Sequence, residues 1–315
     1  MFNINYQTGL FLAFVFGLLI FASVYIYLKR DALKNYTELK NRTLSWWVII
    51  IVTSLALISY FYISILFFAT LSLISLREYF KITPTRKSDY IPIGFAFLAI
   101  VIQYYFIATF WYGMFIIFIP VYMFFFIAAI MVITGNVSDF LKAISIIQWG
   151  MMIAIFNISH LAYLLVLPMQ QYNFDISYST SLGAGLFFYI LFTTQFNDVA
   201  QYIWGKKLGK YKIIPKVSPN KTWAGFLGGM LTTTIISIIL GLWLTPMSLP
   251  FATLMGVLIS IAGFFGDVTI SAIKRDLGIK DTGTLLPGHG GILDRIDSLT
   301  FTAPLFFHLL RYFYY

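Results

Sequence analysis

Long apolar stretches without charged residues recur along the whole chain, and no other feature restricts its fold as strongly. A bilayer core of about 30 Å needs about 20 helical residues to cross it. Stretches of this kind cover residues 8–28, 91–108, 112–133, 144–167, 179–196, 224–244, 251–266 and, shorter than the others, 301–315. The sequence therefore predicts an all-α polytopic integral membrane protein.

One further stretch, residues 45–76, contains 32 residues without a charge. A single helix of this length would measure about 48 Å, which is too long for one ordinary span. Two helices joined near Tyr60 fit the bilayer better. With this hairpin, we expect about ten transmembrane helices.

The composition agrees with a membrane location. Of the 315 residues, 60% are hydrophobic and 10% are charged, whereas soluble domains are about 45–50% apolar and about 25% charged. These values exclude a soluble enzyme and a disordered chain. The net charge of +9 indicates cytoplasmic loops beside anionic lipids, and we expect no nucleic-acid partner. Cysteine is absent, which excludes disulfides, thiol nucleophiles and Cys-ligated metal centres.

Lysine and arginine are distributed very unevenly between the loops. If residues 45–76 form a hairpin, 20 of the 21 bases fall on one side of the membrane. The loops that contain them are 29–42, 77–90, 134–143, 197–223 and 267–299. The positive-inside rule places these loops in the cytoplasm and the N-terminus outside, and we expect the membrane to be the inner membrane of a bacterium. The first apolar stretch has no base before it, which is unlike a signal peptide.

The acidic residues fall into two groups by their surroundings. Most of those in the first half lie among bases in loops, and we interpret them as solvated: Asp31, Glu38, Glu78, Asp89 and Asp139. Asp198 and Asp267 instead stand at the cytoplasmic end of an apolar helix, where an unpaired carboxylate is costly to bury. They are therefore candidates for a functional site, with simple snorkelling at a helix end as the alternative.

The segment 266–298 combines carboxylates, bases and glycines. Asp294 and Asp297 are three residues apart, so on a helix they share one face, and together with Asp267 they could bind a hard divalent cation such as magnesium. The glycines at 290 and 291 would let backbone N–H groups approach phosphate oxygens. This combination suits phosphoryl or nucleotidyl transfer. A polar membrane loop and the lining of an ion pathway stay open as alternatives.

A second polar segment, residues 197–229, contains six lysines and several glycines. Ser218 and Lys221 lie just before an apolar helix, whose N-terminal dipole favours a bound phosphate. The segment therefore suits an anionic ligand such as a nucleoside triphosphate or a lipid phosphate. A plain positive-inside loop accounts for the lysines equally well.

The two polar segments resemble a known family, the phosphatidate cytidylyltransferases. The resemblance rests on a 27-residue window with many matching positions: Ser271, Ile273, Lys274, Arg275, Lys280, Asp281, Gly283, Leu286, Pro287, His289, Gly290, Gly291, Ile292, Asp294, Arg295, Ile296 and Asp297. Upstream, Asn197–Asp198 through Gly205–Lys206 and the run 218–223 are similar to the family's second block. The resemblance is strong over about 180–304 and rests on hydropathy alone before that.

The resemblance implies a reaction in which phosphatidate attacks the α-phosphorus of CTP, so that pyrophosphate leaves and CDP-diacylglycerol forms. It implies a C-terminal catalytic transmembrane region over 179–315, after N-terminal transmembrane helices over 1–178. The implied cofactor is Mg²⁺, with a second, monovalent cation left open. The implied catalytic residues are Asp267, Asp294 and Asp297 (also the metal ligands), Lys274 and Arg295. The implied substrate-binding residues are Asp198, Ser218, Lys221, Ser271, Arg275, Lys280, Asp281, His289, Gly290 and Gly291.

Two positions depart from the family pattern near the expected site. Ile270 stands where many members have a glutamate, and Gln201 stands where small residues are common. They indicate a paralogue whose acceptor lipid or activity differs from that of the housekeeping enzyme. Four alternative functions stay open: transfer to another lipid phosphate, CTP-dependent phosphorylation of a polyprenol, transport of an anionic solute, and a role as a non-catalytic membrane partner. A homodimer is also open. We interpret His160 and His308 as structural residues between helices.

Overall fold

The computed structural model describes residues 5–31, 36–58, 60–171, 176–283, 285 and 290–315, without the side chains of 170–182. All its regular elements are helices, and the described residues add one isolated antiparallel bridge between Lys212 and Thr222. The helices are α1 Tyr6–Leu28, α2 Tyr36–Ile58, α3 Phe61–Ile82, α4 Tyr90–Ala108, α5 Tyr112–Ile117, α6 Phe124–Ile133, α7 Phe140–Met151, α8 Ile158–Val166, α9 Ile176–Leu208, α10 Trp223–Leu244, α11 Leu249–Asp276, α12 Leu293–Ile296 and α13 Leu299–Tyr314. The prediction of an all-α membrane protein is confirmed.

The long uncharged run near the N-terminus is a helical hairpin, as predicted. The first helix, α2, ends at Ile58, and Tyr60 adopts an extended conformation at the start of α3. The two helices have 23 and 22 residues and extend beyond the apolar run at both of its ends. The flanking residues 36–44 belong to α2, and the flanking residues 77–82 belong to α3.

Two of the predicted spans contain an irregular turn. A π-helical segment at Phe118–Met123, which includes Pro120, joins α5 to α6. A second one at Met152–Asn157 joins α7 to α8. A proline has no N–H to donate and disturbs the regular ladder of α-helical hydrogen bonds. The chain nevertheless continues as one helical rod over Tyr112–Ile133, which is the predicted span.

Eight helical stretches in the described part of the chain are long and apolar enough to cross a membrane. They include all the predicted spans except those of α9, which has 33 residues, and α13, which has 16. Helix α9 packs against α10, α8 and α11, and α13 packs against α11 and α8. Both α9 and α13 are therefore packed parts of the same helix bundle.

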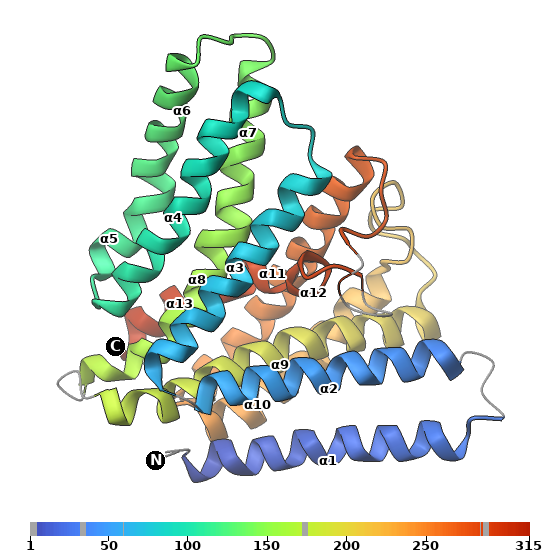
Figure 1. The fold of residues 1–315 in the computed structure, drawn as a ribbon. Helices are drawn as coiled ribbons and strands as arrows, with labels where there is room; N and C mark the ends of the chain where they lie inside the picture. Colours follow the sequence, from blue (N-terminus) through green and yellow to red (C-terminus); the bar gives the residue numbers. More distant parts are fainter. Residues whose placement is uncertain (1–4, 32–35, 59, 172–175, 284, 286–289) are drawn as a thin grey trace.

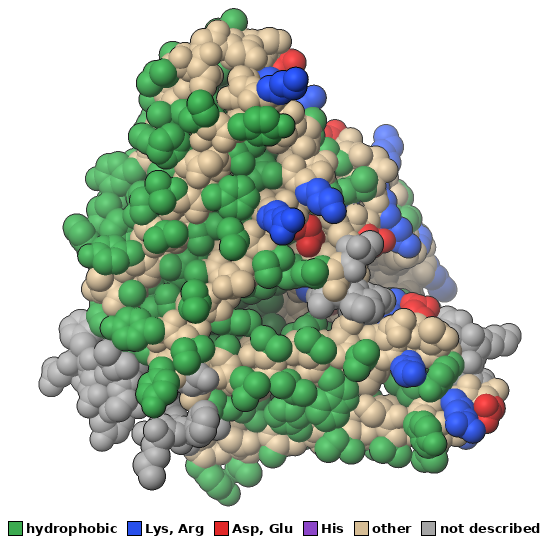
Figure 2. Space-filling view, in the orientation of Figure 1, with side chains coloured by type: hydrophobic (Ala, Val, Ile, Leu, Met, Phe, Trp, Pro, Cys, Tyr) green, Lys and Arg blue, Asp and Glu red, His purple; other side chains and the backbone are tan. Residues whose placement is uncertain are grey.

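The arrangement brings the two chain ends to one side and the polar segments to the other. In Figure 1, α1 begins and α13 ends at the left, while the 209–222 loop and the end of α11 lie at the right. Figure 2 shows a broad hydrophobic surface on the left, and the visible lysines and arginines lie toward the upper and right-hand parts. On the face shown, the bases thus gather toward one side, in agreement with the sequence prediction.

Candidate functional site

A partly buried ion pair joins the two polar segments. Lys221 lies just before α10, and its Nζ is 2.6 Å from Asp267 Oδ2 in α11. The same Nζ donates to Gln201 Oε1 in α9 at 3.1 Å and lies 4.0 Å from Asp198 Oδ1. The Thr222 side chain accepts from the N–H of Gly225 at 3.1 Å and caps α10, so the start of the helix fixes the position of Lys221 between α9 and α11.

A third carboxylate, Asp297, joins this group from the turn between α12 and α13. Ser298 links it to α9, because its N–H donates to Asp297 Oδ1 at 2.8 Å and its hydroxyl donates to Asp198 Oδ2 at 2.9 Å. Burial, followed by the negative charges of Asp267 and Asp198, holds the pKa of Asp297 well above its usual range. Burial opposes the charge of Lys221, but Asp267 and Asp198 outweigh it, and the pKa of the lysine is raised. We call Asp198, Asp267, Asp297 and Lys221 the carboxylate–lysine cluster.

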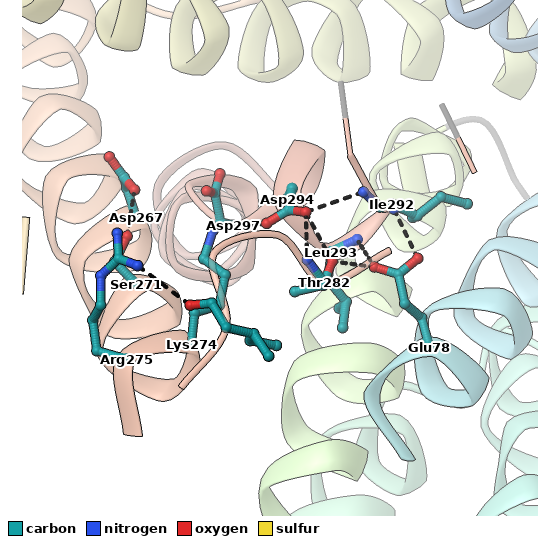
Figure 3. A network of polar contacts seen from close by, with 12 residues as sticks. Glu78, Asp267, Ser271, Lys274, Arg275, Thr282, Ile292, Leu293, Asp294 and Asp297 are labelled. Atoms are coloured by element: carbon teal, nitrogen blue, oxygen red, sulfur yellow. Dashed lines mark hydrogen bonds and ion pairs between the residues drawn. The ribbon is translucent and has the colours of Figure 1, made fainter. Parts of the chain in front are cut away.

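Asp294 has a different set of partners. Its Oδ1 accepts from Lys274 Nζ at 2.7 Å, and its Oδ2 accepts from the N–H groups of Thr282 and Gly291 at 2.8 and 3.0 Å. Burial opposes ionisation here, but these bonds from Lys274 and the backbone lower the pKa of Asp294 below its ordinary value. Figure 3 shows Asp294 on the side of Thr282 and Glu78, with Asp267 beyond Asp297.

The metal ligands expected from the sequence are therefore divided between two groups of contacts. In the part of the chain that the structure describes, no three His, Cys, Asp or Glu side chains are grouped to hold one metal ion. The carboxylate–lysine cluster still has chemistry that suits a cation. Asp198 Oδ1 is buried and accepts no hydrogen bond, and the charges of Asp267 and Asp198 disfavour ionisation of Asp297. A cation bound here would stabilise the negative charge of both Asp198 and Asp297.

Several other expected site residues lie around these two groups. Ser271 donates to Asp267 Oδ1 at 3.3 Å, and Arg275 donates to the carbonyl of Val217 at 3.4 Å. Arg275 thus connects the two polar segments, and the carbonyl of Ser218 accepts from the N–H of Lys221 in the turn beside it.

The remaining expected residues lie in the 278–291 loop. The side chains of Lys280 and Asp281 are exposed, and no described contact ties them to the cluster. Gly290 has φ +79°, and a Cβ there would lie 2.7 Å from Asp294 Oδ2, so only glycine fits this turn. His289 lies outside the described residues.

The sequence interpretation was wrong for two acidic residues, Glu78 and Asp89. Both are buried, with 8% and 2% of their surface exposed. Asp89 accepts from the Arg86 N–H at 2.9 Å and pairs with its guanidinium at 2.7 Å. Glu78 accepts hydrogen bonds from the C-terminal polar segment. Its position on the buried face that includes Phe68, Ser72, Ser75 and Tyr79 was the available sign, because that face repeats every three to four residues.

An apolar cavity of about 200 Å³ lies between α2, α3, α9 and α12, and Arg295 of α12 is one of its lining residues. Its walls include Trp46, Phe68 and Leu191, and its polar lining includes Gln195 and Arg295. The Nε of Arg295 is buried without a hydrogen-bond partner, while the guanidinium interacts electrostatically with Asp198. A second apolar cavity of about 340 Å³, lined by α1, α2 and α9, shares Trp46, Leu191 and Gln195 with the first.

Comparison with known proteins identifies the family. The model of the cytidylyltransferase family matches residues 40–313, which include every helix except α1, the beginning of α2 and the last residue of α13. The chain belongs to the cytidylyltransferase family. A family member of this kind is a nucleotidyltransferase that uses CTP, and the helices make this one an integral membrane protein.

Two kinds of relative are similar to this cytidylyltransferase. The uncharacterized protein YnbB of Escherichia coli (strain K12) is 42% identical over 306 residues, which are 96% of this chain and 97% of that protein. The phosphatidate cytidylyltransferase of Staphylococcus haemolyticus (strain JCSC1435) is 39% identical over 135 residues, which are 42% of this chain and 52% of that enzyme. That of Staphylococcus aureus (strain COL) is 40% identical over 136 residues, with the same shares. The chain thus spans about half the length of these named enzymes.

Proposed function

We propose that this protein transfers CMP from CTP to phosphatidate, and that CDP-diacylglycerol and pyrophosphate are the products, as a step of phospholipid biosynthesis. One observation carries the proposal: Arg295, which interacts electrostatically with Asp198 of the carboxylate–lysine cluster, also lines an apolar cavity, and its Nε has no hydrogen-bond partner. An apolar cavity between helices suits an acyl chain, and a guanidinium suits a phosphate. A lipid phosphate is the substrate class that combines the two.

The reaction needs no protein nucleophile. An oxygen of the lipid phosphate forms the new bond to the α-phosphorus of CTP, and the bond from that phosphorus to the bridging oxygen of the pyrophosphate breaks. Arg295 would orient the lipid phosphate, and Lys274 and Lys221 would neutralise charge on the reacting phosphates. Magnesium, when bound, would supply further charge neutralisation for the triphosphate. Asp267 and Asp297 would hold it together with the Asp198 oxygen that accepts no hydrogen bond, while Asp294 would position Lys274.

We further propose that the site faces the cytoplasm and that the N-terminus lies outside, in a bacterial inner membrane. The bases visible in Figure 2 gather toward one side of that face, and anionic lipid and the positive-inside rule favour the cytoplasm for that side. CTP is a cytoplasmic solute, so the same orientation follows independently from the reaction.

A different acceptor lipid is the second candidate, and it rests on Gln201. Its side chain is buried at the cluster and accepts from Lys221, and its Nε2 has no hydrogen-bond partner. A buried amide donor without an acceptor is costly, so an oxygen of the acceptor lipid would satisfy it. The acceptor is then another lipid phosphate, or a polyprenol that is phosphorylated with release of CDP.

The test uses the purified full-length protein in lipid, supplied with CTP, magnesium and phosphatidate, with pyrophosphate and CDP measured separately. We expect pyrophosphate in step with CDP-diacylglycerol, and Asp267→Asn should abolish both. Asp31→Asn is the matched control, because Asp31 has a 92% exposed side chain. CDP without pyrophosphate would assign a kinase instead. Neither product with any lipid tested, together with CTP-independent uptake of an anion by vesicles, would contradict the enzyme proposal and favour a transporter.

A further inference from the structure

One buried carboxylate of the N-terminal half is bonded to the C-terminal polar segment. Glu78 lies in the last turns of α3, and its side chain accepts from the N–H of Ile292 at 2.9 Å and from that of Leu293 at 3.2 Å. The partners are 214 and 215 residues away in the sequence. The carboxylate thus binds the first N–H groups of α12, which have no acceptor within that helix.

A single threonine connects Glu78 to Asp294. The Thr282 hydroxyl lies in hydrogen-bond contact with Glu78 Oε1 and 3.0 Å from Asp294 Oδ2. The N–H of the same threonine donates to Asp294 Oδ2 at 2.8 Å. Figure 3 shows the resulting chain of contacts, which runs from Glu78 on α3 through Thr282 to Asp294 on α12.

The surrounding backbone is shaped around this carboxylate. A Cβ at Gly291 would overlap Glu78 Oε1, and a Cβ at Gly283 would lie 3.2 Å from Glu78 Oε2. The absence of a side chain at both positions lets the loop close over Glu78. A solvated glutamate, which the sequence suggested, would place no such demand on the loop.

Helix α12 has four residues, and a helix this short is not stable by itself. Its position therefore depends on contacts with other elements. Asp294 and Arg295 lie within α12, and Asp297 follows directly, so a shift at its first turn would move all three relative to Asp267 and Lys221.

We propose that Glu78 is a positioning residue for the catalytic segment. It fixes the start of α12 and the loop at Thr282, and through them it sets the placement of Asp294 and Asp297. The N-terminal half then takes part in building the site as well as in spanning the membrane. The structural part of this inference stands on the contacts alone, and its consequence for turnover rests on the proposed function.

The test compares Glu78→Gln with the wild type by hydrogen exchange and by turnover. Gln keeps the size of the side chain, but its NH₂ group turns one of the two acceptors into a donor that faces other donors. A buried donor without an acceptor destabilises the contact that it replaces. We therefore expect exchange in residues 290–298 to be faster by about tenfold or more, with exchange in α9 and α10 unchanged. The kcat for CMP transfer should fall by a similar factor.

Two further variants separate this role from general stability. Thr282→Ser keeps the hydroxyl and should retain both the exchange protection and kcat, whereas Thr282→Val should lose both. Glu38→Gln is the matched control, because Glu38 is an exposed glutamate of α2 that pairs with Arg42. If Glu78→Gln does not fold, the Thr282 pair decides the proposal.

The proposal would be overturned by unchanged exchange at 290–298 in Glu78→Gln, by an unchanged kcat in spite of faster local exchange, or by a uniform loss of protection in all helices. A wild-type protein without CMP transfer would instead contradict the proposed function. In that case the local exchange of the Glu78 and Thr282 variants still decides whether Glu78 positions the segment.

Discussion

Removing the charge of Lys221 should destabilise the protein strongly, and the structure gives the magnitude. Lys221→Met keeps the unbranched side chain and deletes the ammonium group, which is 2.6 Å from Asp267 Oδ2. At an effective dielectric constant of about 20, such a charge pair is worth about 6 kcal/mol before desolvation is counted. Loss of one partner of a buried pair typically costs about 3–5 kcal/mol. Because the two side chains are 16% and 22% exposed, we expect the lower end, about 3 kcal/mol.

The assay is the free energy of unfolding of the full chain, measured by denaturant titration in mixed micelles. The double variant Lys221→Met/Asp267→Asn should regain about 2 kcal/mol, because it no longer leaves an unpaired charge at this position. Lys216→Met, at an exposed lysine of the same loop, should change the stability by less than about 0.5 kcal/mol. A loss below about 1 kcal/mol for Lys221→Met, or a double variant as unstable as the sum of the single ones, would refute the reasoning.

Other measurements test the remaining parts of the site. Because the pKa of Asp297 is raised, its contribution to the stability of the fold is complete below the ordinary Asp pKa of 3.8 and is lost as the pH rises through the raised pKa. Asp297→Asn should therefore stabilise the fold at pH 7 and not at pH 3. The same variant should lose turnover. For Asp294 the pH dependence of stability has the opposite sign, because its pKa is lowered: its contribution to stability is present above pH 3.8 and is lost as the pH falls. Asp294→Asn should therefore destabilise the fold at pH 7. Unfolding curves of the two variants between pH 3 and pH 7 check both predictions. Gln201→Ser should raise the preference for phosphatidate over other lipid phosphates, and an unchanged ratio of kcat/KM values would dismiss a role in specificity. Cysteines placed at Lys210 and Leu249 should react with an impermeant reagent from opposite sides of the membrane, and labelling of both from one side would contradict the topology.

Apolar runs predicted the helices well because transfer of a segment into a bilayer depends on the segment itself. The break near Tyr60 followed from length alone, since 32 uncharged residues exceed one span. The same kind of reasoning failed for Glu78 and Asp89. Both stand among bases in the sequence. The repeat of the buried face of α3 includes Glu78 and was a local sign of its burial, but the segment that packs against this face is known only from the tertiary structure.

In the expected site, too, the sequence predicted local features but did not predict the contacts between distant segments. The spacing of Asp294 and Asp297 predicted one shared helical face, and Asp297, the C-cap of α12, keeps helical φ and ψ angles. The two carboxylates nevertheless meet different partners: Lys274 and the loop N–H groups around Asp294, and the Asp198 and Asp267 charges around Asp297. Which groups come near each carboxylate depends on how distant segments pack, and the spacing does not contain this information.

The sequence by itself determined a helical membrane protein and the set of groups available for chemistry on phosphates. Hydropathy and residue identity are properties of short segments, so they can be read from the sequence. Only the tertiary structure decided that Lys221 pairs with Asp267 and that Glu78 holds the start of α12. Ion pairs and buried hydrogen bonds depend on distances of a few ångströms between distant segments, and these distances exist only once the helices have packed.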